Sequence, residues 1–241
     1  MREIFAATLL SLLPTTVILG PWASEPSAEP LTITQQASAT DEEYLTWSAD
    51  QAVNIGKSWR VNGRVGGAFD LRLIHTEHSY NYKLRATLMT PEVIRAAARL
   101  EQIRMHLTDE QARALVKEAE RGNNLVVLVE IDAREGSGVI PLDWRSALKP
   151  GGTKDDSPAI ISGINTPTLR NVNALSGVAR RDYAYDIFWV VFPLMDQKGN
   201  SVWANVPSNI ELVVGIYNKQ GNVTWTVSEP LRRRLSSMNK Q

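Results

Sequence analysis

Apolar and polar residues alternate with a period of two along several stretches of this chain. Residues 69–75 and 80–88 form two such runs on either side of a short polar turn, and they predict an antiparallel hairpin with one buried face. A last hairpin is predicted from residues 210–216 and 223–227, because turn-forming residues separate the two runs. The strongest late strand is predicted at 183–192. Its members on one side are Tyr183, Tyr185, Ile187, Trp189 and Val191.

Residues 91–121 follow a helical period instead. Thr90 is a good N-cap, and Pro91 takes the first helical position, where its missing N–H costs nothing. A capping box opens a second helix at Thr108, and Gly122 ends that helix. The apolar stripes are Val93, Ala97, Leu100 and Ile103 on the first helix, and Ala112, Leu115, Val116 and Ala119 on the second. We expect a helical hairpin packed on the sheet, with Leu100 and Leu115 buried at the centre of the stripes.

Most of the remaining predicted elements are strands. Residues 125–131 are apolar on both faces, which is typical of a central strand. Shorter strands are predicted at 44–47, 59–61 and 139–142, and a polar loop at 149–158. Strands and helices do not alternate as they do in parallel units. The predicted fold is therefore mainly β (α+β): an antiparallel β-sandwich-like domain with an inserted helical hairpin at about residues 91–121.

The N-terminus has the pattern of a signal peptide. An apolar run from Ile4 to Gly20 is shorter than the roughly 20 strongly apolar residues of a spanning helix. An uncleaved anchor and a buried helix are the alternatives. The predicted organisation is a signal peptide at 1–23, a flexible leader at 24–42, a single β-rich globular domain at 43–230 and a basic C-terminal tail at 231–241. A signal peptide places the mature chain in the periplasm or makes it a secreted protein.

Composition narrows the function classes. The chain has 241 residues with 26 Lys plus Arg and 26 Asp plus Glu, so its net charge is zero. Balanced charge disfavours nucleic-acid binding and binding to anionic membranes, both of which use surplus cations. Cysteine is absent, which excludes disulfides and a lipoprotein anchor. A chain of this length can bury enough apolar surface to fold without such links. These features favour a bacterial envelope protein with no transmembrane segment in the mature chain.

Metal and cofactor chemistry has few candidate residues. His75, Glu77 and His78 form the one histidine cluster, and His75 and Glu77 could share a face of a strand with a bound Zn²⁺. However, His75 continues the apolar set of the run 69–75, and His106 is the single histidine left to complete a site. We expect a structural role for these residues, no metal ligands and no cofactor.

Acidic clusters are the second candidate chemistry. The densest acidic stretch is Glu130, Asp132, Arg134, Glu135 and Asp143. Paired carboxylates of this kind can act as general acid and base or bind Ca²⁺. The stretch lacks the spacing of a calcium loop, and charges at a strand end are commonly solvated. Asp155 and Asp156 in the polar loop have the same interpretation.

Motifs for nucleophilic catalysis and phosphate binding are missing. Ser137 lies between two glycines, but the flanking residues do not form a nucleophile elbow, and the sequence has no dinucleotide or Walker motif. The catalytic residues are therefore unknown. Aromatic residues could line a sugar or peptide platform, with Tyr183 and Tyr185 next to Arg180-Arg181-Asp182, although period-two aromatics more commonly form the sheet core. Asn222-Val223-Thr224 has the form of a glycosylation sequon.

The leading functional hypothesis is a non-enzymatic envelope protein. It would act as a binding or assembly module, through its sheet surface or an exposed edge strand, with another envelope protein or a peptide as partner and no nucleic acid. The alternative is a hydrolase or metal-dependent enzyme whose loop-built site cannot be recognised from one sequence.

Overall fold

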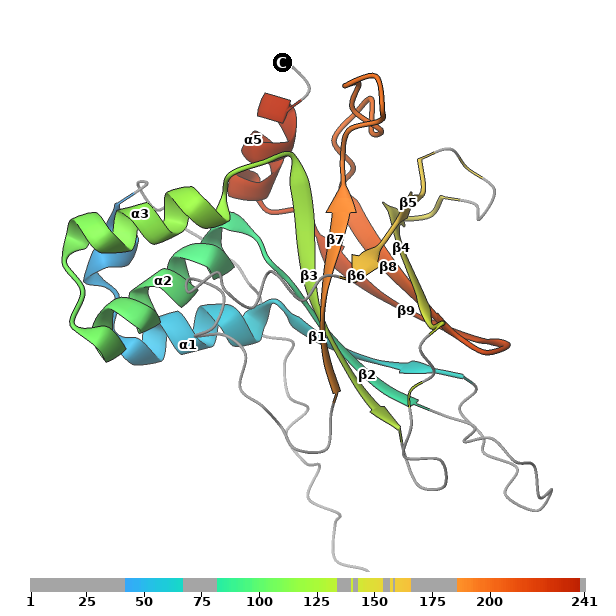
Figure 1. Cartoon of the computed structure of the whole chain (residues 1–241), viewed down its shortest axis with the longest axis horizontal. Coiled ribbons are helices and arrows are strands. Elements are labelled where there is room, and N and C mark those ends of the chain that lie inside the picture. The colour runs from blue at the N-terminus through green and yellow to red at the C-terminus, as the bar shows by residue number, and fades with distance from the viewer. Residues whose placement is uncertain are drawn as a thin grey trace, which may run out of the picture. The chain divides into compact units, whose positions relative to one another are not determined.

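Two antiparallel sheets and a group of helices make up the described part of the protein (Figure 1). The computed structural model describes residues 42–66, 82–133, 143–153, 159–165 and 186–238, together with Ile140 and Ser157. Nine strands and four α-helices lie in these residues. The predicted fold class, mainly β with a helical insertion, is confirmed.

The described elements have the following bounds. The helical elements are η1 (Glu43–Thr46), α1 (Ala49–Ser58), α2 (Pro91–Met105), α3 (Asp109–Ala119) and α5 (Glu229–Met238). The strands are β1 (Arg60–Val65), β2 (Tyr82–Leu88), β3 (Asn124–Ala133), β4 (Arg145–Pro150), β5 (Ile161–Ser162), β6 (Ile164–Asn165), β7 (Asp186–Pro193), β8 (Asn209–Ile216) and β9 (Lys219–Thr226). We call α1, α2 and α3 together the helical layer.

The first sheet has the order β1-β2-β3-β7-β6. Its central strand β3 is buried on both faces, since Val127 and Val129 on one face and Leu128 on the other are all at most 2% exposed. This confirms the prediction from the apolar run 125–131. β2 pairs with β1 on one side and with β3 on the other. Within the described residues β2 therefore pairs with β1 and β3, whereas the run 69–75, its predicted hairpin partner, lies outside them.

The second sheet has the order β5-β4-β8-β9. The predicted last hairpin is confirmed, because β8 and β9 pair along their whole length and Tyr217 makes the turn with φ of 53°. Alternate residues of β8 face the core and are 0% exposed: Ile210, Leu212, Val214 and Ile216. β4 was not predicted, and Lys149 and Pro150, expected in a polar loop, are its last two residues.

The two sheets share a continuous stretch of chain at one edge. Ile161 and Ser162 pair with β4 of the second sheet, and two residues later the same stretch pairs with β7 of the first. Gly163 lies at the crossing, and its N–H donates to the Ser146 carbonyl at 2.8 Å. A Cβ at Gly163 would overlap Ser146 Oγ and lie 2.6 Å from Val190 Cγ1. Any larger residue would force the neighbouring side chains to move. Close packing therefore requires glycine at the position where the chain passes from one sheet to the other.

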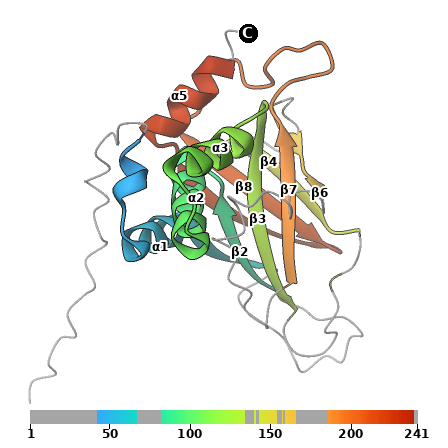
Figure 2. The same cartoon turned by 60° about the vertical axis from the view of Figure 1, so that its left-hand side comes forward.

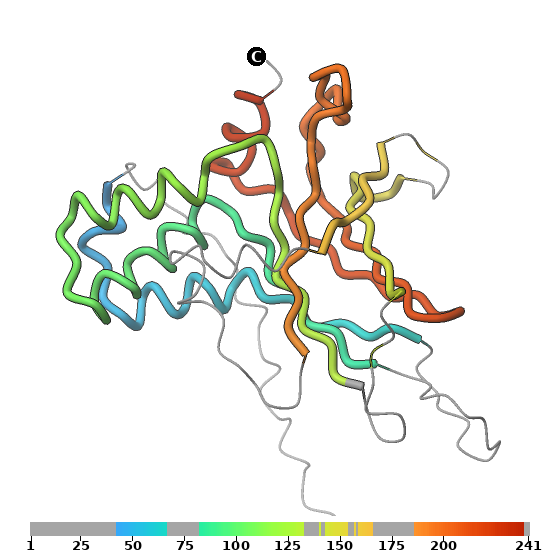
Figure 3. Tube along the Cα trace, in the orientation of Figure 1, coloured from blue at the N-terminus to red at the C-terminus, as the bar shows by residue number. Residues whose placement is uncertain are grey.

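At the other edge, β1 and β9 lie against each other. The Gly66 N–H donates to the Gln220 carbonyl at 3.2 Å, and Trp225 Nε1 donates to the Trp59 carbonyl at 2.9 Å. A Cβ at Gly221 would overlap the Arg64 carbonyl. The backbones of the two edge strands are therefore in contact, and the chain path in Figure 3 shows the two sheets meeting there.

In the helical layer, α2 lies between α1 and α3 (Figure 2). Both predicted helix starts are confirmed, because Thr90 Oγ1 accepts from the Val93 N–H and Thr108 forms a full capping box with Gln111. Helix α1 was not predicted. It opens with its own capping box, in which Ser48 Oγ accepts from the Gln51 N–H and Gln51 Oε1 accepts from the Ser48 N–H.

The apolar stripe predicted for α2 is only partly correct. Val93 and Ala97 are buried, but Leu100 is half-buried and Ile103 is 38% exposed. The buried face is turned toward Ile94, Ala98 and their neighbours, because α2 packs between two helices rather than flat on the sheet. On α3 the prediction is closer, since Val116 is buried and Leu115 is half-buried against the core.

Two further predictions are wrong at the ends of the domain. Residues 44–47, predicted as a strand, begin in the 3-10 turn η1. Residues 231–238, predicted as part of a basic tail, belong to helix α5, in which Leu231, Leu235 and Met238 are buried at helical spacing. Arg232, Arg233 and Arg234 lie between Leu231 and Leu235, and their charges favour a basic tail over an amphipathic helix when the sequence is considered alone.

Candidate functional site

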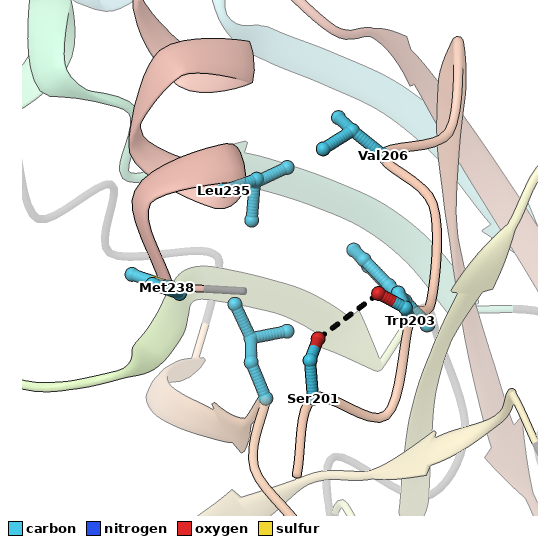
Figure 4. A pocket seen from close by; sticks show the side chains of 6 residues that line it. Ser201, Trp203, Val206, Leu235 and Met238 are labelled. Carbon is cyan, nitrogen blue, oxygen red and sulfur yellow. Dashed lines mark hydrogen bonds between the residues drawn. The ribbon is translucent and has the colours of Figure 1, made fainter. Parts of the chain in front are cut away.

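A small apolar pocket lies between α5 and the segment after β7 (Figure 4). It is lined by Leu194, Ser201, Trp203, Val206, Leu235 and Met238. It has room for about one water molecule. The one hydroxyl in it is already used, because Ser201 Oγ donates to the Trp203 carbonyl at 3.0 Å. We interpret the pocket as a packing gap, because it has neither the room nor the polar groups that a substrate needs.

The acidic stretch that begins in the last residues of β3 forms structural ion pairs. Glu130, with 3% of its side chain exposed, accepts from Arg60 through both carboxylate oxygens, at 2.8 Å from Nε and 2.5 Å from Nη2. Asp132 lies 3.7 Å from the Lys83 ammonium. A carboxylate held by a bidentate guanidinium is fixed and neutralised, so Glu130 is poorly suited to proton transfer. Asp143 is exposed, and Arg134 and Glu135 lie outside the described residues.

Most other candidate residues also lie outside the described part. These are His75, Glu77, His78, Ser137, Asp155, Asp156, Tyr183 and Tyr185, with the neighbouring Arg180-Arg181-Asp182. His106 is the exposed C-cap of α2, with φ of 53°. Within the described ranges, His, Asp and Glu side chains form no group of three that could hold a metal ion. Asn222 is exposed and donates to Glu211 Oε1 at 2.7 Å.

The position of Trp189 bears on whether the aromatic residues of β7 belong to the core. Its side chain is 7% exposed and shares a face with Ile187, opposite Leu128 and Glu130 of β3. This buried position agrees with the prediction that the period-two aromatics of this strand belong to the core. A ligand platform on this face would need the described aromatic to be accessible, and it is not.

Sequence reasoning missed the segment that precedes α1. Residues Glu42–Trp47, which we call the strap, lie next to α2 (Figure 2). The Arg99 Nε donates to the Trp47 carbonyl at 2.7 Å, and Arg113 Nε lies 3.2 Å from Glu42 Oε1. The strap is thereby attached to both α2 and α3. Two aromatic residues three apart, directly before a capping box, were the signal that could have revealed it.

Tyr44 is the buried anchor of the strap. Only 2% of the residue is exposed, and its ring lies edge-on to Trp47 with 6.4 Å between centroids. Its hydroxyl is buried and has no hydrogen-bond partner among the described residues. Burial raises the pKa of Tyr44, while the positive charges of Arg113 and Arg95 act in the opposite direction. The tyrosine therefore lies among charged side chains of α2 and α3.

The end of α2 exposes apolar surface. Ile103 is 38% exposed and Met105 is 53% exposed, whereas most apolar residues earlier in the helix are buried. The other large apolar residues exposed in the described ranges, Ile164 and Tyr217, lie on β6 and in the β8–β9 turn. The two exposed residues of α2 are therefore close in sequence and lie at one end of the helical layer.

No protein-family model matches this chain, and comparisons with curated proteins and with solved structures find no match. None of the helices in the described ranges combines the length and apolar character that crossing a membrane requires.

Proposed function

We propose that this protein is exported and acts as a non-enzymatic binding or assembly module, whose partner is another envelope protein or a peptide. The observation that carries the proposal is the apolar surface at the end of α2, where Ile103 and Met105 are 38% and 53% exposed. The two residues are two positions apart and so project to different sides of the last turn of α2. Large apolar residues exposed together at one helix end favour a surface that a partner covers. We place the contact on the helical layer.

One sheet edge favours this placement. Strand addition needs an edge with free backbone groups. In the described residues the edge strands β1 and β9 are in contact, and β5 and β6 belong to one continuous stretch. An incoming strand therefore has little free backbone to pair with at the edge of β1 and β9. At the other edge, β5 and β6 pair with only two residues each of β4 and β7. The helical layer is a third route, beside the sheet surface and the edge strand expected from the sequence.

The carboxylates of the acidic stretch favour a binding function over a catalytic one. Of the three described members of the densest acidic stretch, Glu130 and Asp132 are held in ion pairs with Arg60 and Lys83, and Asp143 is exposed. Catalytic carboxylates need access to a substrate and a pKa adapted to proton transfer. Neither ion-paired residue faces a cavity described here, and a binding role needs no such group.

The proposal includes export. The apolar run Ile4–Gly20 and the polar leader after it motivate a cleaved signal peptide. We expect the mature chain to begin between Pro21 and Glu29. Mass spectrometry of the protein purified from an envelope fraction measures this start. Recovery of a cytoplasmic protein with Met1 intact would contradict export.

Site-specific crosslinking tests the binding surface. A photo-crosslinking amino acid replaces Met105 in the full chain, and in a matched control it replaces Thr224, which is exposed on β9. We expect a discrete adduct from position 105 in cells that export the protein, and its loss when Ile103→Asp is added. Absence of an adduct, or equal adducts from both positions, would contradict a partner at the end of α2.

A further inference from the structure

The strap resembles a short peptide bound to the helical layer. Its one fully buried side chain is Tyr44, beside which Leu45 and Trp47 are partly buried against the core. Its polar contacts join Glu42 to Arg113 and the Trp47 carbonyl to Arg99. A peptide bound to a protein surface commonly has this arrangement, with one aromatic anchor in a desolvated site and polar contacts around it.

The polar groups of the strap add little to its attachment. The Arg113–Glu42 pair leaves 43% and 68% of the two side chains exposed, so solvent screens it. The Tyr44 hydroxyl loses its water without gaining a partner among the described residues, which opposes its burial. The strap itself contains only one short 3-10 turn. Short segments whose polar contacts are open to solvent commonly open locally before the core of a protein does.

Helix α1 does not need the strap in order to begin. The capping box of Ser48 and Gln51 satisfies N–H groups at the start of α1 from within the helix itself. The strap ends at Trp47, immediately before this cap. It can therefore leave the helical layer by rotation about the residues at the junction, with the cap of α1 intact.

We propose that the strap is a displaceable internal ligand, and that the site of Tyr44 on α2 and α3 also accepts a separate peptide with an acidic residue two positions before a tyrosine. The strap's own residues define this chemistry, because Glu42 and Tyr44 contact or approach cations of the helical layer. When the strap is displaced, its site on α2 and α3 becomes accessible.

Competition with a labelled peptide tests the inference. The probe is a fluorescent peptide with the sequence of residues 42–48, and its anisotropy reports binding to the full chain. We expect the Tyr44→Ala chain, whose strap has lost its anchor, to bind the probe at least tenfold more tightly than the unmodified chain does. A control probe with alanine in place of tyrosine should not bind either chain.

Two further measurements separate the outcomes. If the Tyr44→Ala chain folds, as its circular dichroism will show, but does not bind the probe, the proposal is wrong. If that variant does not fold, hydrogen exchange on the unmodified chain decides. We expect the Leu45 and Trp47 amides to exchange at least tenfold faster than the Ile94 amide in α2. Equal rates would mean that the strap is an integral part of the fold. The crosslinking at Met105 can fail or succeed independently of this result.

Discussion

The sheets and the helical layer are built from different kinds of contact. Along β8, every second residue is a fully buried Ile, Leu or Val, and the two sheets meet at both edges. In α2 the buried face includes Ala96, Ala97 and Ala98, and two polar residues, Glu101 and Gln102, are buried beside them. The sheets therefore depend on large apolar side chains, whereas the helices approach one another through small ones.

Polar bonds compensate for small side chains in the helical layer. Gln102 accepts from Arg99 Nη1 at 2.7 Å and donates to Asp109 Oδ1 at 2.7 Å, and its carbonyl accepts from the Leu107 N–H. One residue thus connects α2, the following turn and the start of α3. Contacts of this kind fix geometry but contribute less stability than buried apolar area does. We infer that the sheets contribute most of the free energy of folding, and that the helices of the helical layer can shift relative to one another at lower cost.

The largest expected effect is in the second sheet. Leu212 on β8 is 0% exposed, so Leu212→Ala should lower the free energy of unfolding by about 2–5 kcal/mol, because burial is lost and a cavity remains. Val213 on the opposite face of the strand is half-buried, and Val213→Ala should cost about 1 kcal/mol or less. Urea titrations measure both. If the two substitutions lowered the free energy of unfolding equally, the two faces of β8 would be equally buried.

The edge shared by the sheets gives the next effect. Gly163→Ala adds a Cβ that meets Ser146, Val190 and Phe192, and overpacking of this kind costs about 1–3 kcal/mol. Gly215 is a matched control on β8, because the nearest atom to a Cβ there is 3.8 Å away. Gly215→Ala should be close to neutral. Thermal or urea unfolding of the two variants compares them, and a harmless Gly163→Ala would mean that the crossing is loosely packed.

The sequence predicted elements well where one local rule decided them. The β8–β9 hairpin, the central strand β3 and the caps at Thr90 and Thr108 each follow from neighbouring residues. Alternation identifies a strand with one buried face, and a capping box identifies a helix start, whatever the tertiary fold. Each of these was confirmed.

Predictions failed where tertiary packing decided. The buried face of α2 is set by α1, which the sequence did not reveal, so Leu100 is less buried than its stripe indicated. Arg99, which is not part of the predicted apolar stripe, donates to the Trp47 carbonyl 52 positions earlier. The strap as a whole depends on such distant contacts. The sequence predicts a strand at its aromatic residues, because their partners on α2 and α3 are remote in sequence.

The third prediction concerns Leu100, which belongs to the apolar stripe that the sequence predicted for α2. Leu100 is half-buried, so Leu100→Ala should lower the free energy of unfolding by about 1 kcal/mol or less. Burial at the centre of the stripe, as the sequence suggested, would cost as much as Leu212→Ala in the sheet. Urea titrations of both variants under one condition compare the two regions directly. A loss at position 100 equal to that at position 212 would refute the packing of α2 described here.

The smallest expected effect concerns the strap at alkaline pH. Burial raises the pKa of Tyr44 above its ordinary value near 10. Below that pH the hydroxyl is protonated in both the folded and the unfolded chain, so Tyr44 adds no pH dependence. Above it, the unfolded chain loses the proton first and is stabilised, while the folded chain must keep the neutral hydroxyl buried. The contribution of Tyr44 is therefore fully present below about pH 10 and is lost as the pH rises through the folded-state pKa.

Tyr44→Phe isolates this contribution, because lysines and other tyrosines also titrate in the same range. We expect the difference in unfolding free energy between the unmodified chain and Tyr44→Phe to be constant up to about pH 10 and then to shift in favour of the phenylalanine variant. One proton limits the slope to about 1.4 kcal/mol per pH unit. Tyr217→Phe, in an exposed turn, is the control. If Tyr44→Phe and Tyr217→Phe follow the same pH profile, Tyr44 is solvated in solution and the strap does not hold a buried anchor.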